Sequence, residues 1–305
     1  MKETIKFTIP ASSANLGSGF DTLCIAVNLL NYFEIELSDS KTTLEVIEGL
    51  DNKLQPPCQE MVKAAAHYFF KRSGAKPKDF TLRINNKTPI ARGLASSATI
   101  RLAVLVGLNQ LLNLDITERD IVKWAAELEG CTDNVSACYY GGLTASGIIK
   151  NKLAIYRFDI PDKIDFVAVS PSSEVETDKA RDIFSRNIPR EDAIYTLNRG
   201  ILLASAFAIG DYESMGDLFD DRIHQPQRQA NIPALKPLFD VIKAARKAGA
   251  IGAYLSGSGS TMMALTIQNK EDVAIAMKEA IAKYNMQAEI RFLKADNSGL
   301  QYVFD

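Results

Sequence analysis

The stretch PIARGLASSATIRLAVLVGLNQLLN, residues 89–113, decides how the rest of the chain is read. Pro89 and Gly93 mark a loop, and apolar residues then recur at helical spacing. We therefore expect a helix that begins at Ser96 and Ser97. Small residues let the backbone approach a ligand, and the N–H groups at a helix N-terminus favour an anion such as a phosphate.

An ordinary core helix, capped at its N-terminus after a turn, would have a similar sequence. Short Gly/Ser loops are weak motifs, so the residues alone leave both interpretations open. The stretch contains no Gly-Lys-Ser/Thr, which excludes a Walker loop here.

The whole chain has the composition of an ordinary soluble protein. Its 305 residues suffice for two domains, and 24% of them are charged. A formal net charge of −2 gives no electrostatic reason to expect a nucleic-acid partner. Its apolar stretches are too short to span a bilayer, so we expect no membrane partner. The four cysteines form no CxxC pair and the N-terminus has no apolar signal core, which favours a cytoplasmic protein with reduced thiols.

Residue patterns before position 150 predict strands mixed with helices. A strand over residues 5–9 should end at Pro10 and lead into a polar loop at 11–21. Further strands are expected at 32–37, 43–47, 80–84 and 143–149, the first two of them antiparallel. Helices are expected at 60–71, after a polar loop at 51–59, and at 118–128, with Thr117 as N-cap and Gly130 just beyond the end.

The second half again mixes strands and helices, in an α+β pattern. A domain boundary is expected near residues 151–161, where charge rises and Pro161 interrupts. The expected strands are 165–169, 250–255, 262–267 and 288–293. The expected helices are 192–208, 211–219, 233–248 and 272–284.

Several polar groups are candidates for a binding site. The loop at 11–21 offers Asn15 and Asp21 on a flexible backbone, but a plain turn is an equal alternative. Asp133 and Asn134 follow Gly130 and could equally be turn formers. A basic cluster, RIHQPQR at residues 222–228, is harder to explain as a solvated surface.

Three separated stretches resemble the three motifs of the GHMP kinases. They are PASSANLGSGFD at residues 10–21, PIARGLASSA at 89–98 and LSGSGST at 255–261. Within that superfamily the chain is similar to the homoserine kinase family, through the form of these motifs and three further patterns. Those patterns are Asp133-Asn134-Val135 before Gly141-Gly142, Thr177-x-x-x-Arg181, and His224-Gln-Pro-x-Arg228.

The resemblance implies an α+β fold of two domains with the active site between them. Residues 1–155 would form an N-terminal nucleotide-binding domain of the ribosomal protein S5 domain 2-like type. Residues 156–305 would form a ferredoxin-like C-terminal domain. The implied activity is ATP-dependent phosphorylation of L-homoserine to O-phospho-L-homoserine, a step of threonine biosynthesis, with Mg²⁺. The sequence does not give the oligomeric state, and a homodimer is one assembly open to the chain.

The resemblance also implies roles for individual residues. Residues 93–98 would form the phosphate-binding loop. The full set that would bind ATP comprises Pro89, Ala91, Arg92, Gly93, Leu94, Ala95, Ser96, Ser97, Ala98 and Thr99. Mg²⁺ would be held by Ser97 and by Glu127 or Glu129, between which the sequence does not choose. The substrate would be bound by Asn15, Asp21, Cys131, Arg181 and Arg228. The groups beside the transferred phosphoryl group would be Asp133, Asn134 and Thr177.

Two details of the resemblance leave alternatives open. Cys131-Thr132 stands where His-Pro is usual in the family, and Ala95 stands where a glycine is usual. A GHMP kinase for another small hydroxy acid or for an amino acid such as threonine is one alternative. A GHMP-like sensor that binds its ligand without turnover is the other.

Overall fold

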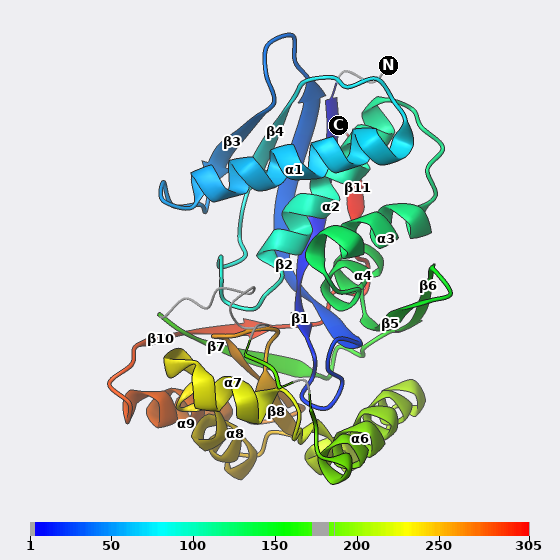
Figure 1. The fold of residues 1–305 in the computed structure, drawn as a ribbon. Coiled ribbons are helices and arrows are strands. Elements are labelled where there is room, and N and C mark those ends of the chain that lie inside the picture. The colour runs from blue at the N-terminus through cyan, green and yellow to red at the C-terminus, as the bar shows by residue number, and fades with distance from the viewer. Residues whose placement is uncertain (1–3, 173–182, 186, 305) are drawn as a thin grey trace.

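The computed structural model describes residues 4–172, 183–185 and 187–304, and it is built around two sheets (Figure 1). The larger sheet has seven strands in the order β11-β1-β2-β4-β3, with β5 and β6 continuing from β2. The smaller has four strands in the order β10-β7-β9-β8. The mixed α+β architecture predicted from the sequence is confirmed.

The bounds of the larger part are as follows. Its strands are β1 (Thr4–Ala14), β2 (Leu23–Leu37), β3 (Thr43–Glu48), β4 (Phe80–Asn85), β5 (Leu143–Ile149), β6 (Lys152–Phe158) and β11 (Gln301–Val303). Its helices are α1 (Gln55–Ser73), α2 (Ser96–Leu111), α3 (Glu118–Glu129) and α4 (Asp133–Tyr140).

The lower part in Figure 1 contains the smaller sheet and the remaining helices. Its strands are β7 (Asp165–Pro171), β8 (Gly252–Leu255), β9 (Met262–Thr266) and β10 (Ala288–Leu293). Its α-helices are α6 (Arg190–Ile209), α7 (Gln225–Asn231), α8 (Leu238–Lys247) and α9 (Lys270–Ala282), with 3₁₀ turns η1 (Glu213–Phe219) and η2 (Pro233–Leu235). No helix in the described ranges is long and apolar enough to cross a membrane.

Helix α2 is the centre of the upper core. It packs against α1, α3 and α4 and against strands β1 and β2. A helix that is apolar on all sides needs to be buried on all sides. In α2 every residue is buried except Ser97, Arg101 and Gln110, which are partly exposed. The predicted start of this helix at Ser96 is confirmed. Its burial holds that start rigidly against the rest of the fold.

Local end signals were read correctly on α3. The Thr117 hydroxyl accepts a hydrogen bond from the backbone N–H of Asp120 at 3.2 Å. Gly130 follows the helix with φ of 83°, in the left-handed region that glycine adopts without strain. Both signals depend only on residues a few positions away.

Two predictions that rested on prolines were wrong. Strand β1 does not stop at Pro10 but shifts register between Pro10 and Ala11 and continues to Ala14, so Ser12 and Ser13 belong to a strand. The loop expected at 51–59 ends early, because α1 already begins at Gln55. Pro56 lies in its first turn, where the missing N–H would have no partner in the helix.

Strand pairing also differed from the prediction for residues 43–47. Strand β3 does not pair with β2, because β4 lies between them and pairs with β3 in parallel. Helix α1 is the crossover that such a parallel pair requires. Residues 301–303, for which no strand was predicted, return to the larger sheet and pair with β1.

The loop at 256–260 connects the two parts of the molecule through hydrogen bonds to backbone carbonyl groups. The N–H of Gly257 donates to the carbonyl of Ala14 at 3.1 Å, and the Ser256 hydroxyl donates to the carbonyl of Gly93 at 2.6 Å. The N–H of Thr261 donates to the carbonyl of Arg92 at 3.1 Å. This loop therefore holds the ends of the 10–21 and 89–98 stretches together.

Gly93 should be intolerant of any side chain. Its φ is 74°, and a Cβ there would lie 2.1 Å from the carbonyl oxygen of Ser256. We expect Gly93→Ala to lower the free energy of unfolding by about 2–4 kcal/mol, measured by urea denaturation. Gly74→Ala is the matched control: φ is 69° but nothing lies within 4 Å, so the loss should be only about 1 kcal/mol. Equal losses in the two variants would contradict the close approach.

Candidate active site

A cavity of about 210 Å³ opens in front of the N-terminus of α2. It is lined by all three of the separated stretches and by residues around Gly130. The lining residues that the sequence had singled out are Asn15, Asp21, Pro89, Ala91, Arg92, Gly93, Leu94, Ala95, Ser96, Ser97, Glu129, Cys131, Asp133, Asn134 and Arg228. The tertiary structure therefore brings most of the predicted site together.

The start of α2 provides the anion-favouring end of this cavity. Ala95 holds the N-cap position with φ of 65°, and its side chain has no group that could accept a hydrogen bond from the first N–H groups of the helix. The first N–H groups of α2 face the cavity side of the helix start, which is the arrangement that the anion-binding interpretation of residues 89–113 requires. Ala98 and Thr99, also predicted for the loop, are buried in the helix and do not line the cavity.

The two candidate glutamates point in different directions. Glu129 lines the cavity, accepts a hydrogen bond from the Ser97 hydroxyl at 2.6 Å, and forms an ion pair with Arg101. Glu127 accepts a hydrogen bond from Tyr68 and lies 3.6 Å from Arg72, and it is not among the described residues that line the cavity. Of the two glutamates, Glu129 is therefore the one that reaches the cavity among the described residues.

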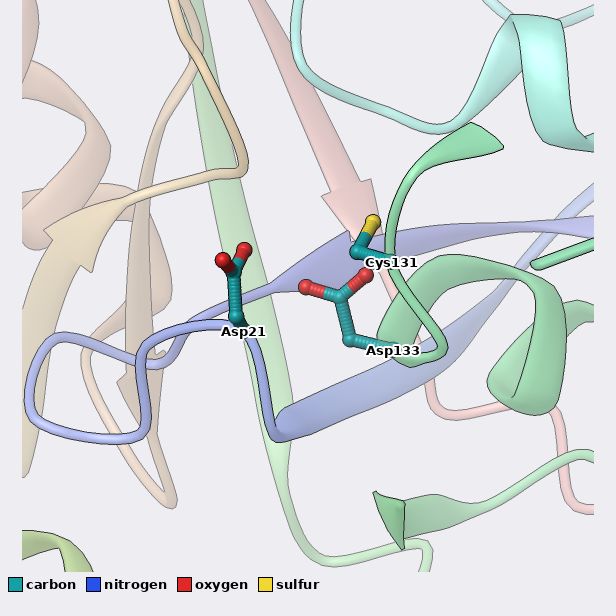
Figure 2. Close-up of side chains that lie close together, drawn as sticks. All are labelled: Asp21, Cys131 and Asp133. Carbon is teal, nitrogen blue, oxygen red and sulfur yellow. The ribbon is translucent and has the colours of Figure 1, made fainter. Parts of the chain in front are cut away.

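Asp21, Cys131 and Asp133 converge in the cavity (Figure 2). One carboxylate oxygen from each aspartate and the sulfur of Cys131 lie within 4.8 Å of one another. Asp133 is the first residue of α4, where the helix dipole favours a carboxylate, and its Oδ1 accepts from the N–H of Asn134 at 2.6 Å. This end of the cavity is suited to a cationic or hydroxyl-bearing group.

Asn15 and Asn134 line the cavity, but their amides also hold the surrounding chain. Asn15 accepts from the N–H of Asp21 at 3.0 Å and donates to the carbonyl of Gly257 at 3.1 Å. Asn134 accepts from the Ser12 hydroxyl at 3.0 Å and from the Cys24 thiol. Burial, followed by the charge of Asp133, raises the pKa of Cys24 well above its usual value, so the thiol keeps the proton that it donates.

Arg228 approaches the cavity from α7 and is almost fully buried. Its Nη1 donates to the carbonyl of Gly257 at 2.6 Å and lies 3.1 Å from Nδ1 of His224. The other predicted arginine, Arg181, and the predicted catalytic Thr177 lie outside the described residues. Of the two arginines predicted to bind the substrate, Arg228 is therefore the one that the described residues place at the site.

Sequence reasoning missed one wall of the cavity. Cys58, Met61 and Ile90 line an apolar side. Met61 lies within the helix predicted over residues 60–71, and a helical pattern does not distinguish a core contact from a ligand contact. Only the approach of α1 to the start of α2 reveals this wall.

Comparisons with known proteins identify the family of the chain. The family model described as the GHMP kinases N terminal domain matches residues 60–142, and the model described as GHMP kinases C terminal matches residues 203–285. The chain belongs to the GHMP kinases.

Relatives that match nearly the whole chain are homoserine kinases, which are one group within that family. The chain is 33% identical to a homoserine kinase of Carboxydothermus hydrogenoformans, covering 95% of this chain and 94% of the relative. It is 30% identical to a homoserine kinase of Petrotoga mobilis, covering 99% and 97%. A crystal structure of homoserine kinase from Cytophaga hutchinsonii is similar with a TM-score of 0.85 and 28% identity, over 99% of this chain and 98% of that one.

The buried histidine makes stability depend on pH. Burial lowers the pKa of His224 from 6.5 to about 4, since the raising effect of the Asp221 carboxylate is smaller. Between these two pH values the unfolded chain binds a proton at His224 that the folded chain does not. The contribution of the neutral, buried His224 to the free energy of unfolding is therefore fully present above about pH 6.5 and is lost as the pH falls towards 4.

We expect His224→Gln to remove this dependence. Across pH 7 to 4, the free energy of unfolding of the wild type should fall by roughly 3 kcal/mol more than that of the variant, measured by urea denaturation at each pH. Parallel curves for the two proteins would show that His224 titrates normally.

Proposed function

We propose that this GHMP kinase transfers the γ-phosphoryl group of ATP to the side-chain hydroxyl of L-homoserine, giving O-phospho-L-homoserine. The observation that supports this most directly is the composition of the cavity. Two arginines (Arg92 and Arg228), three carboxylates (Asp21, Glu129 and Asp133) and the N-terminus of α2 share one small space. The names of the full-length relatives agree with the same substrate.

Each group of the amino acid has a complementary group in the cavity. The Arg228 guanidinium suits the substrate carboxylate, because its planar fork matches two oxygens. The Asp21 carboxylate suits the ammonium group, and Asp133 suits the hydroxyl. Asn15 and Asn134 would hold this arrangement through their hydrogen bonds, and the roles of Thr177 and Arg181 rest on the family resemblance.

The phosphates of ATP would lie at the start of α2. The backbone N–H groups of residues 93–98 and the Ser96 and Ser97 hydroxyls would donate to the phosphate oxygens. Phosphoryl transfer depends on alignment and charge stabilisation more than on covalent help. Asp133 would orient the attacking hydroxyl and accept its proton late in the transfer.

The residues at the start of α2 fit a magnesium ion. The Ser97 hydroxyl and the Glu129 carboxylate are oxygen donors, which this cation prefers, and the Glu129 side chain is only 6% exposed beside the proposed phosphate site. When bound, Mg²⁺ would neutralise the phosphate charge that builds up during transfer. Ser97 and Glu129 would then be its protein ligands.

Further features of the proposal concern the whole chain. The proposed domains, residues 1–155 and 156–305, each contain one of the two sheets apart from two strands: β6 (Lys152–Phe158) runs across the boundary, and β11 belongs to the larger sheet. A cytoplasmic setting is supported by four free cysteines. A place in threonine biosynthesis rests on the family resemblance, and a homodimer is one assembly open to the chain.

A substrate panel tests the proposed activity. Homoserine, threonine, serine and mevalonate are each supplied with MgATP, and ADP release is followed in a coupled assay. We expect the highest kcat/KM with homoserine. Preference for another acceptor would identify a different GHMP kinase, and binding of homoserine without ADP release would identify a sensor.

The two glutamates provide a matched test of the metal site. Glu129→Gln should lower kcat on the order of 10- to 100-fold and raise the Mg²⁺ concentration needed for half-maximal rate, because a carboxylate at the phosphates is lost. Glu127→Gln, two positions away and turned from the cavity, should change neither value more than about twofold. Thermal melting of both variants checks the fold, and the reverse ranking would assign the metal to Glu127.

A further inference from the structure

We propose that His224 is a positioning residue that holds the Arg228 guanidinium in the orientation that binds the substrate carboxylate. This inference rests on the proposed function and deepens it. His224 is fully buried and does not line the cavity, so it would act through Arg228 rather than on the substrate itself.

The hydrogen bonds of the imidazole fix its tautomer. Nε2 lies 2.8 Å from the carbonyl oxygen of Gly17, and Nδ1 lies 3.1 Å from Nη1 of Arg228. A carbonyl oxygen only accepts and a guanidinium only donates. Nε2 therefore carries the hydrogen and donates to Gly17, while the lone pair of Nδ1 accepts from Arg228.

The ring itself is held on several sides. Phe20 stacks on it with ring centroids 4.8 Å apart and an interplanar angle of 16°. The Asp221 carboxylate accepts from the backbone N–H groups of Ile223, His224 and Gln225 at 2.7, 2.9 and 2.7 Å. Both the backbone and the side chain of His224 are thus fixed before any substrate arrives.

This rigidity passes to Arg228. Its Nη1 is shared between His224 and the carbonyl of Gly257, and its guanidinium lies 5.6 Å from the ring of Phe20 and 5.1 Å from that of Phe184. A free arginine loses about 2 kcal/mol of rotamer entropy when it is ordered. An arginine already ordered by these contacts binds a carboxylate without that loss.

His224 also links the two ends of the proposed amino-acid site. Gly17, which accepts its hydrogen bond, belongs to the segment that carries Asn15 and Asp21. Asp21 is the proposed partner of the ammonium group, and Arg228 is the proposed partner of the carboxylate. One imidazole therefore sets the position of Arg228 relative to the segment that carries Asp21.

Two isosteric variants separate the two hydrogen bonds. In His224→Asn the amide oxygen lies near the place of Nδ1 and can still accept from Arg228. In His224→Gln the amide nitrogen lies near the place of Nε2 and can still donate to Gly17, but the acceptor for Arg228 is lost. We expect His224→Gln to raise the KM for homoserine about 10-fold or more, and His224→Asn to keep it within about 3-fold of wild type. The KM for ATP should change less than about twofold in both.

The carboxylate is tested directly with 3-aminopropan-1-ol, which is homoserine without that group. Wild type should prefer homoserine strongly, and His224→Gln should lose about 10-fold of this preference. In an Arg228→Ala background, adding His224→Gln should change the KM for homoserine by less than about twofold, since no guanidinium remains to be positioned.

The outcomes distinguish the inference from the proposed function. Wild-type protein that does not phosphorylate homoserine overturns the proposed function. If the wild type is active but the His224→Asn and His224→Gln variants have equal KM values for homoserine, the positioning role is overturned and the proposed function stands. This holds whether or not the melting temperatures of the variants fall. Should His224→Gln not fold, Phe20→Leu removes the stacked ring and should raise the homoserine KM selectively, and an unchanged KM there also overturns the role.

Discussion

The close approach of Gly93 to the loop at 256–260 is the contact on which the site depends. Ser256 donates to the carbonyl of Gly93, although the two residues are 163 positions apart in the sequence. A Cβ at Gly93 would overlap this contact, so the backbones meet only because glycine has none. With Gly257 bonded to Ala14 from the same loop, three distant segments share one cavity instead of forming three surface loops.

Helix α2 gives that cavity its rigid wall. Because nearly all of its surface is buried in the upper core, the position of its first turn is set by packing on every side. The residue at its N-cap position is Ala95, whose side chain offers no acceptor to the first N–H groups, whereas Ser, Thr, Asp or Asn ordinarily stabilises this position. Functional sites on buried helices hold their geometry more accurately than sites on loops, which suits a reaction that depends on alignment.

Predictions from local signals succeeded where the signal concerned only neighbouring residues. Thr117 and Gly130 cap and end α3 through contacts within one turn, and Ser96 begins α2 directly after a left-handed residue. Proline was misread twice, because its effect depends on context. Pro10 interrupts the pairing of β1 without ending the strand, and Pro56 lies in a first turn, where helices tolerate proline.

The sequence by itself determined the helix start, the polar and glycine-rich stretches and the family that they define. The tertiary structure alone decided which of those residues face the cavity. Glu127 and Glu129 are two positions apart on α3, so their side chains point about 200° apart around the helix axis. Only the packing of α3 against α2 turns Glu129, and not Glu127, towards Ser97. Such packing is set by contacts between segments that are distant in the sequence, and a local sequence pattern does not predict those contacts.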